Sequence, residues 1–588
     1  MSDFWEKLIR EENLDWPDYV TAERFWEGQS RDFLMPDNVI ELGRDTEDFS
    51  TAYIRLGDPW VAMFISGQPG MGKSKLMECL GRQIIDYPTE VAFVVLDPHE
   101  ELYQGLRNYC SYRKLEERTV LFDPAREDYL PGYNPLRPNH IPIPTQIDMK
   151  LQAFLKVTGE EPLEKAWIYR WTKDVLTSIR EREGILQEAE YLLDYYDNTY
   201  RKVLIKQTTA RMVLKDWKWF SDPKVPLREK QARVDGTETR LRRFLDHPTI
   251  ARIINQKERQ LDLVDIITNG KILLCNFKQR VTNSLTEEGA SILGTLLLDD
   301  IVETAFYLKK PVVIMVDEFQ YWVKEDIGVI LNEGRKHGLK MIFGCQYPGQ
   351  IELQNENIFR AVLNNSQIKV IFGGLDFKDL YTLARNIYTG HLDPQRRKLE
   401  IKTKYYPPIK TREKVYTRGR HWSKSEGSSW GTTASVGTTR IPVPGFLEPD
   451  KVSYHEAEVS SEASFAGSSW GGSEVESDIP WYDYEEKEQL SSVQFYSIDE
   501  QLEEKIAELH KQPQRQMTVE LPGHEIRKVK VPYIDDKPDN EAWTKAALAR
   551  DWKTIKEIDG ERSQYLKILE AEARAQIEPP KRRRKKLK

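Results

Sequence analysis

Residues 67 to 74 carry the clearest chemical pattern in the sequence. They read Gly-Gln-Pro-Gly-Met-Gly-Lys-Ser, which fits the phosphate-loop pattern G-x-x-x-x-G-K-[ST]. Glycines let backbone N–H groups turn toward a β-phosphate, and the N-terminus of a following helix adds its positive dipole end. We expect Lys73 to neutralise β- and γ-phosphate oxygens and the Ser74 hydroxyl to coordinate Mg²⁺. The predicted nucleotide-binding residues are Gly67, Gln68, Pro69, Gly70, Met71, Gly72, Lys73 and Ser74.

A second pattern supplies two carboxylates. The apolar run Val312–Val316 is followed by Asp317 and Glu318. Asp317 is predicted to hold Mg²⁺ through water, and Glu318 to orient and deprotonate an attacking water. An acidic N-cap of the next helix is the plain alternative. Because the same sequence also contains a phosphate loop, Asp317 and Glu318 favour ATP hydrolysis over a plain helix cap. The predicted ligands are ATP and Mg²⁺.

Arg335 and Gln346 are the remaining candidates for the site. Arg335 stands before the apolar run Lys340–Phe343, and Gln346 stands just after it. A Gln at the carboxyl end of a parallel strand can hydrogen-bond a γ-phosphate, and an Arg there can reach the nucleotide of an adjacent subunit. The alternatives are a C-capping cation and a loop hydrogen bond, and position alone does not decide between them.

These residues need a sheet to position them. Short, nearly continuous apolar runs alternate with amphipathic segments, which indicates a mostly parallel α/β sheet covered on both faces. The expected strands are Val61–Ser66, Val91–Leu96, Lys271–Phe277, Val312–Val316, Lys340–Phe343 and Gln367–Phe372. An amphipathic helix with Leu76, Leu80 and Ile84 on one face is expected to follow the phosphate loop.

The rest of the chain divides by composition. The pentapeptide Gly-Ser-Ser-Trp-Gly occurs at 427–431 and again at 467–471, which is typical of a low-complexity linker. Pro522-Gly523 lies between two strand-like runs and predicts a hairpin. The expected divisions are a helical lead-in at 1–50, a discontinuous ATPase core at 51–145 and 251–405, an all-α insertion at 146–250, a Ser/Gly/Trp-rich linker at 406–480, a small helix-hairpin module at 481–540, and a helix with a basic tail at 541–588.

Composition excludes several classes of protein. No apolar run approaches the roughly 18–20 residues that a membrane span needs, and the N-terminus does not resemble a secretory signal. The four cysteines are far apart, as expected of reduced core residues and not of a disulfide framework. Lys and Arg number 86 against 94 Asp and Glu, a net charge of −8, which neither supports nor excludes a nucleic-acid partner. A cytoplasmic protein is expected.

From about residue 51 to 405, the chain resembles the HerA/FtsK superfamily of P-loop ATPases, in particular its HerA-like and type IV secretion coupling-protein branch. Asp97-Pro98-His99-Glu100 is similar to a segment of that branch that usually has Lys in place of His99. The series continues in order through Asp123-Pro124, Asn134-Pro135-Leu136, Asn276-Phe277, Asp317-Glu318, Glu333-Gly334-Arg335 and Gln346-Tyr347.

The resemblance implies a RecA-like core, a homo-hexameric ring, an Arg335 that acts in trans and a Gln346 that senses nucleotide. It also implies DNA as a sequence-independent partner, an all-α insertion that faces DNA, and membrane or secretion-channel partner proteins. Two departures stand out: the transmembrane helices that begin the membrane-anchored members are absent from this sequence, and the insertion has no identifiable DNA-reading pattern.

Three functions stay open. The favoured hypothesis is a ring ATPase that translocates DNA, with channel cations gripping phosphates. Candidate cations are Lys278, Arg280, Arg240, Arg242 and Arg243, and the basic run 581–588 is a further candidate tether. The alternatives are an ATPase that powers protein secretion or assembly, and a nucleotide-gated scaffold that recruits an effector in a defence system.

Overall fold

A computed structural model describes residues 39–87, 91–139, 141–158, 166–279, 285–322, 327–421, 433–440, 452–459 and 471–577. The chain forms two units: unit 1 is Met1–Leu392 with Ile498–Lys588, and unit 2 is Asp393–Ser497. Most of the expected lead-in at 1–50 lies outside the described residues. Where it is described, the expected helix is wrong, because Ile40–Asp45 forms a strand whose Ile40 and Leu42 are buried in the core.

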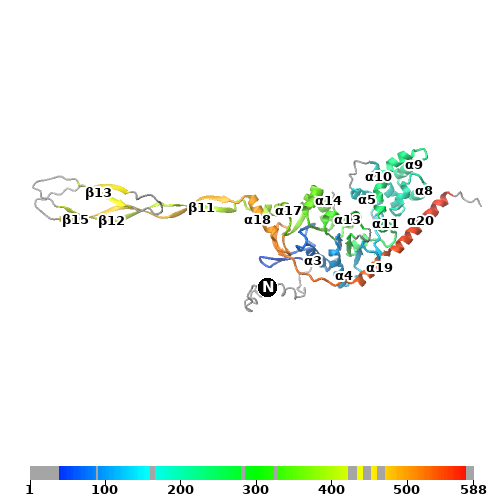
Figure 1. The fold of residues 1–588 in the computed structure, drawn as a ribbon, viewed down its shortest axis with the longest axis horizontal. Coiled ribbons are helices and arrows are strands. Elements are labelled where there is room, and N and C mark those ends of the chain that lie inside the picture. The colour runs from blue at the N-terminus through cyan, green and yellow to red at the C-terminus, as the bar shows by residue number, and fades with distance from the viewer. Residues whose placement is uncertain are drawn as a thin grey trace, which may run out of the picture. The chain divides into compact units, whose positions relative to one another are not determined.

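Unit 1 is built on an 11-stranded sheet (Figure 1). Its strands are β1 (Ile40–Asp45), β2 (Thr51–Ile54), β3 (Ala62–Ser66), β4 (Ala92–Asp97), β5 (Thr119–Phe122), β7 (Ile272–Asn276), β8 (Val312–Val316), β9 (Leu339–Cys345), β10 (Ser366–Phe372), β17 (Gln516–Leu521) and β18 (Glu525–Lys530). Their order in the sheet is β2-β1-β18-β17-β10-β3-β9-β8-β4-β7-β5. All six strands expected from the sequence are confirmed.

The central part of the sheet is parallel. The pairs from β10 through β3, β9, β8, β4 and β7 to β5 all run parallel. Every residue of β3, β4, β7 and β8 is buried, and since successive side chains point to opposite faces, both faces are covered. One strand, β9, separates the phosphate-loop strand β3 from β8. The fold is therefore α/β with a RecA-like P-loop core, as expected.

Helices of unit 1 pack around this core. They are α3 (Lys73–Ile85), α4 (Glu101–Tyr112), α12 (Leu263–Thr268), α13 (Glu287–Leu308), α14 (Ile327–Gly334), α15 (Pro348–Gln354), α16 (Glu356–Asn365) and α17 (Phe377–Tyr388). α3 packs against α4, α12 against α13, and α14 against α16. Side-chain caps fix two starts: the Thr286 hydroxyl accepts a hydrogen bond from Gly289 N–H before α13, and Asn355 caps α16.

A group of helices connects β6 (Tyr129–Leu130) to α12. It consists of α5 (Ile143–Thr158), α6 (Ala166–Glu181), α7 (Glu188–Leu193), α8 (Thr199–Leu204), α9 (Arg211–Phe220), α10 (Leu227–Leu245) and α11 (Pro248–Ile254). Its interior is aromatic: the ring of Trp171 lies 5.5 Å from Trp217 and 5.2 Å from Phe220, between centroids. This helical group occupies the position of the expected all-α insertion.

The C-terminal part of the chain differs from expectation. The predicted hairpin forms as β17 and β18, but it is not a separate module, because β17 pairs with β10 and β18 pairs with β1. α18 (Ile498–His510) packs on α17. The single helix expected at 541–575 is divided into α19 (Glu541–Asp551), β19 (Lys553–Thr554) and α20 (Ile555–Ile577), since β19 pairs with β6.

A C-terminal strap, residues 531–577, ties the sheet to the helical group. Its carbonyl at Asp535 accepts a hydrogen bond from Arg82 of α3, and its Asp539 pairs with Arg107 of α4. Farther along, Trp552 donates to the carbonyl of Leu121 on β5. α20 then reaches the helical group, where Asp559 pairs with Arg252 and Arg562 donates to Gln187.

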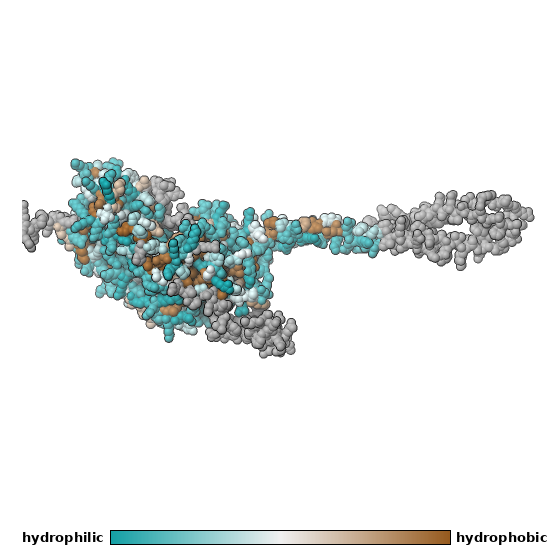
Figure 2. Space-filling view, turned by 180° about the vertical axis from the view of Figure 1, so that it is seen from behind, coloured by the Kyte–Doolittle hydropathy of each residue, from teal (hydrophilic) through white to brown (hydrophobic). Residues whose placement is uncertain are grey.

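Unit 2, residues 393–497, covers the end of the expected core, the expected linker at 406–480 and the start of the expected helix-hairpin module. Its strands form nested antiparallel pairs: β11 (Arg397–Tyr405) with β16 (Lys487–Phe495), β12 (Pro408–His421) with β15 (Gly471–Tyr484), and β13 (Thr433–Arg440) with β14 (Val452–Val459). Residues of the β11–β16 pair are exposed on both faces, including Leu399, Ile401, Leu490 and Phe495, and Figure 2 shows apolar surface there. The Ser- and Gly-rich composition did not indicate these strands, and the outer pair joins residues as far apart as Arg397 and Phe495.

None of the helices in the described part of the chain is both long and apolar enough to span a membrane.

Candidate functional site

The phosphate loop lies between the end of β3 and the start of α3. Gly70 and Gly72 have φ angles of 82° and 116°, in the left-handed region that favours glycine. A Cβ placed on Gly70 would meet no atom within 4 Å, so the loop borders open space. Because α3 begins at Lys73, the N–H groups of its first turn have no acceptor within the helix. The loop therefore offers the geometry and the donors that a phosphate group requires.

Lys73 brings the two sequence patterns together. Its ammonium Nζ lies 2.8 Å from Asp317 Oδ1 and 2.5 Å from Glu318 Oε1, and its side chain is only 4% exposed. Burial lowers the pKa of Lys73, but the charges of Asp317 and Glu318 more than offset this, and the pKa is raised above its ordinary value. A buried cation between two carboxylates is thus held firmly at the mouth of the loop.

Glu318 is held in a strained backbone conformation. Its φ of 46° is left-handed, which is rare for a residue with a side chain and is typical of functional sites. The carboxylate accepts a hydrogen bond from Gln320 at 2.7 Å and makes no cap bond to the following 3₁₀ turn (Phe319–Tyr321). The N-cap alternative therefore does not describe this side chain.

Asp317 is fixed from several directions. Its Oδ1 accepts the backbone N–H of Glu318 at 3.0 Å, and its carbonyl accepts Trp322 Nε1 at 3.1 Å. The carboxylate packs against Gly344 of β9. A Cβ on Gly344 would lie 2.7 Å from Asp317 Oδ1. A glycine is required there because the side chain of Asp317 approaches the neighbouring strand so closely.

Ser74 and Asp317 suit a magnesium ion. Ser74 follows Lys73 on α3, and Lys73 contacts Asp317, so the hydroxyl and the carboxylate belong to the same end of the sheet. Both are oxygen donors, the ligand type that Mg²⁺ prefers, and Mg²⁺ keeps most of its remaining positions for water and phosphate oxygens. The donor set therefore fits the ion predicted from the sequence.

Gln346 and Arg335 lie at opposite ends of β9. Gln346 is half-buried and directly follows Cys345, whose carbonyl accepts the backbone N–H of Gly67 at 3.3 Å. It therefore stands beside the first residue of the phosphate loop. Arg335 begins the 3₁₀ turn Arg335–His337 before β9, at the opposite end of that strand from Gln346. Arg335 thus lies away from the loop of its own chain.

A second acidic cluster extends the site along the sheet. Asp97, Asp123 and Asn276 stand at the carboxyl ends of β4, β5 and β7, and Asn276 Nδ2 donates to Asp123 at 3.1 Å. Burial, followed by the charge of Asp317, raises the pKa of Asp97 to about 6. Glu100 belongs to the cluster because Asn276 Nδ2 also donates to it, at 3.4 Å, and it forms an ion pair with Lys278 at 2.6 Å. The Asp-Pro and Asn-Phe signatures mark these positions in the sequence, but no site role was predicted for them.

Asp123 gives this cluster a measurable pH dependence. Burial raises its pKa to about 6. Between about pH 4 and pH 6 the folded state therefore binds more protons than the unfolded state. The contribution of Asp123 to the free energy of unfolding falls over this range as the pH rises, by about 3 kcal/mol in all. Asp123→Asn removes the titration, while its amide oxygen can still accept from Asn276 and Ala125, which both bond Oδ1.

We expect the stability of Asp123→Asn relative to the native chain to increase as the pH rises from about 4 to about 6. Urea unfolding at several pH values measures the difference. Parallel stability profiles for the two proteins would contradict the prediction.

The predicted channel cations have mixed surroundings. Lys278 is paired with Glu100, and Arg242 pairs with Glu238 at 2.8 Å. Arg240 donates to the carbonyl of Gly236, whereas Arg243 is exposed. Arg280 and the basic run 581–588 lie outside the described residues.

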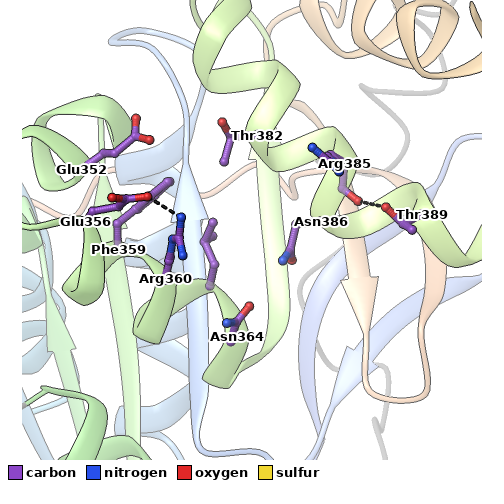
Figure 3. A pocket seen from close by; sticks show the side chains of 10 residues that line it. Glu352, Glu356, Phe359, Arg360, Asn364, Thr382, Arg385, Asn386 and Thr389 are labelled. Atoms are coloured by element: carbon purple, nitrogen blue, oxygen red, sulfur yellow. Dashed lines mark hydrogen bonds and ion pairs between the residues drawn. The ribbon is translucent and has the colours of Figure 1, made fainter. Parts of the chain in front are cut away.

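A separate groove lies on unit 1 between α15, α16 and α17 (Figure 3). It has a volume of about 430 Å³ and is open to solvent. Glu356 and Arg360 form an ion pair on one wall, and Thr389 donates to the carbonyl of Arg385 on the other. None of its lining residues belongs to the phosphate loop, so this groove is distinct from the candidate site.

Comparison with solved structures finds similarity to two kinds of protein. The bacterial conjugative coupling protein TrwBdeltaN70, in a trigonal form in complex with sulphate, has 13% identity and a TM-score of 0.45 over 89% of this chain and 93% of that chain. The plasmid coupling protein TrwB in complex with the non-hydrolysable GTP analogue GDPNP has 13% identity and a TM-score of 0.43 over 82% and 87%. VirB4 of Thermoanaerobacter pseudethanolicus has 16% identity and a TM-score of 0.39 over 60% and 88%.

No protein-family model matches the chain, and no curated protein matches its sequence.

Proposed function

We propose that this chain hydrolyses ATP with Mg²⁺ at the phosphate loop and uses the energy, as a ring of identical subunits, to move DNA. The contact of Lys73 with both Asp317 and Glu318 carries the enzymatic part of the proposal. It joins a phosphate-binding loop, an ion-binding carboxylate and a second carboxylate at one end of a parallel sheet, where ligands of such sheets bind.

Each residue has a distinct task in the proposed reaction. The loop N–H groups bind the α- and β-phosphates and Lys73 binds the β- and γ-phosphates, which requires Lys73 to exchange carboxylate contacts for phosphate contacts. This exchange releases Glu318 to accept a proton from a water that attacks the γ-phosphorus. Magnesium, bound by Ser74 and Asp317, supplies positive charge that offsets the charge of the phosphates. Gln346, beside the loop, hydrogen-bonds the γ-phosphate and reports its presence.

A cationic helix face supports nucleic acid as the cargo. On α9, Arg211, Lys215 and Lys218 are exposed and spaced so that they share one side of the helix. Among the described residues, no ion pair neutralises them. The one acidic residue of α9, Asp216, is buried and pairs with Arg170. Such a face attracts phosphate backbones without reading base sequence.

The DNA part of the proposal is tested by measuring ATP hydrolysis with and without duplex DNA at several salt concentrations. We expect duplex DNA to stimulate hydrolysis several-fold at low salt, and stimulation to weaken as salt rises. Changing Arg211, Lys215 and Lys218 together to Glu should abolish stimulation and leave basal hydrolysis unchanged. Changing the exposed Lys556 and Lys567 of α20 to Glu is the matched control.

Basal hydrolysis without any response to DNA would overturn the DNA cargo and favour a motor for protein secretion or assembly. Absence of hydrolysis under all conditions would overturn the enzyme itself.

Arg335 is proposed to act on the nucleotide of a neighbouring subunit, since it lies away from its own loop. We expect Arg335→Ala to bind ATP but to lose about 10³-fold or more in hydrolysis, as when an arginine finger is removed. Mixing it with Lys73→Ala protein should restore part of the activity, because mixed rings then contain complete sites. Unchanged inactivity in the mixture, measured by phosphate release, would contradict a role in trans.

A further inference from the structure

The chain returns to the phosphate loop after unit 2. Gln514 Nε2 donates a hydrogen bond to the carbonyl of Gly70 at 2.8 Å, and the backbone N–H of Arg515 donates to the carbonyl of Met71 at the same distance. A Cβ on Gly72 would lie 3.4 Å from the Cα of Arg515. Gln514 and Arg515 therefore form one wall of the loop, although about 440 residues separate them from it in the sequence.

Arg515 holds an aromatic ring at this wall. Its carbonyl accepts the backbone N–H of Val531 at 2.8 Å, and its guanidinium donates to the carbonyl of Val531 at 3.1 Å. The guanidinium carbon lies 5.5 Å from the centroid of the Tyr533 ring, which is 56% exposed. Arg515 also has a left-handed φ of 66°, so the surrounding contacts impose its conformation.

The strap fixes the position of Tyr533 on its other side. Asp536 pairs with Lys75 Nζ at 2.8 Å, and Lys75 directly follows Ser74 on α3. Tyr533 lies in the short stretch of chain between Val531, which contacts Arg515, and Asp536, which contacts Lys75. Its ring is more than half exposed, so burial of apolar area in the core does not explain its position beside Arg515.

Val531 and Asp536, on either side of Tyr533, contact Arg515 of the loop wall and the first turn of α3, the two parts of the motif nearest a bound nucleotide. Backbone N–H groups of the loop and the first helical turn bind the α- and β-phosphates in this motif, and the nucleoside is attached to the α-phosphate. An exposed aromatic ring with a guanidinium over it is a platform on which a flat base can stack. Stacking on these flat groups uses the face of a base, which every purine has.

We propose that Tyr533 and Arg515 form the nucleoside subsite of the phosphate loop and bind the base of a purine nucleoside triphosphate by stacking. The inference rests on the proposed nucleotide-binding function and extends it to the part of the ligand beyond the phosphates. Stacking without edge recognition predicts that ATP and GTP bind with similar affinity.

The test compares Mg–ATP with Mg–tripolyphosphate, which has phosphates but no nucleoside, by calorimetric titration of the full chain. We expect Tyr533→Ala to weaken ATP binding about tenfold and to leave tripolyphosphate binding unchanged. Tyr533→Phe keeps the ring and should bind both ligands as the native chain does. Tyr112→Ala is the matched control, since Tyr112 is exposed and lies under Lys537 of the same strap, away from the loop.

Equal ATP affinity in Tyr533→Ala and the native chain would overturn the subsite, as would an equal loss for both ligands. If the native chain binds neither ligand, the nucleotide-binding function fails together with the subsite. These outcomes are distinguishable because the native chain is measured with both ligands first.

Discussion

Lys73→Ala is expected to abolish Mg–ATP binding and also to destabilise the folded chain. The ammonium is the only cation that contacts Asp317 and Glu318 among the described residues, and both carboxylates are almost fully buried. Its removal leaves two adjacent buried negative charges without a cation, and breaking a buried ion pair costs about 3 kcal/mol or more. The phosphates of ATP then meet repulsion where they would have met a cation.

A matched control separates these two effects. Lys369 on β10 pairs with Glu520 on β17 at 2.7 Å, and both side chains are buried. Lys369→Ala therefore breaks a similar ion pair away from the loop, and we expect comparable destabilisation with ATP binding retained. Urea unfolding and titration with Mg–ATP measure the two quantities. Retained ATP binding in Lys73→Ala would contradict the assignment of the loop.

Glu318→Gln is expected to bind ATP and to lose hydrolysis. Glutamine has nearly the same size and can keep the contact with Gln320, but it cannot accept the proton of the attacking water. We expect turnover to fall on the order of 10²- to 10⁴-fold. Binding should be at least as tight as in the native chain, because Lys73 is then held by one carboxylate charge instead of two.

Single-turnover phosphate release and equilibrium binding test this pair of expectations. Glu356→Gln is the control, since Glu356 is exposed and pairs only with Arg360 among the described residues. Turnover in Glu318→Gln close to that of the native chain would show that another group activates the water. Loss of binding together with turnover would show that Glu318 is needed to shape the loop.

The parallel core and the phosphate-loop site could be predicted from sequence because their signals are local. Continuous apolar runs predicted six strands, and Asp317 and Glu318 stand directly after one of them, β8. The six are β3, β4, β7, β8, β9 and β10. Strands β3, β9 and β8 are neighbours in the sheet and run parallel, so their carboxyl ends lie at the same edge and the residues just beyond them come together. The contact of Lys73 with both carboxylates follows from that rule.

The parts that the sequence did not predict depend on distant partners. The sequence of β17 and β18 predicts an isolated hairpin. In the structure, β17 instead pairs with β10, which precedes it by about 150 residues. Unit 2 has a composition typical of a linker, and only its pairing reveals strands. Tyr533 and Arg515 belong to no motif, and the contact of Arg515 with Met71 is visible only after the chain has folded back.

The strap makes the nucleotide-binding sheet and the helical group depend on each other for stability. Its peptide chain is inextensible, and it is anchored to α3 through Asp535, to β5 through Trp552 and to α11 through Asp559. Trp552, Ile558 and Leu569 of the strap are buried, so heat or denaturant should melt both parts in a single cooperative step. For the same reason, a displacement of the wall beside Met71 is passed along a continuous covalent tether to the helices that display Arg211, Lys215 and Lys218.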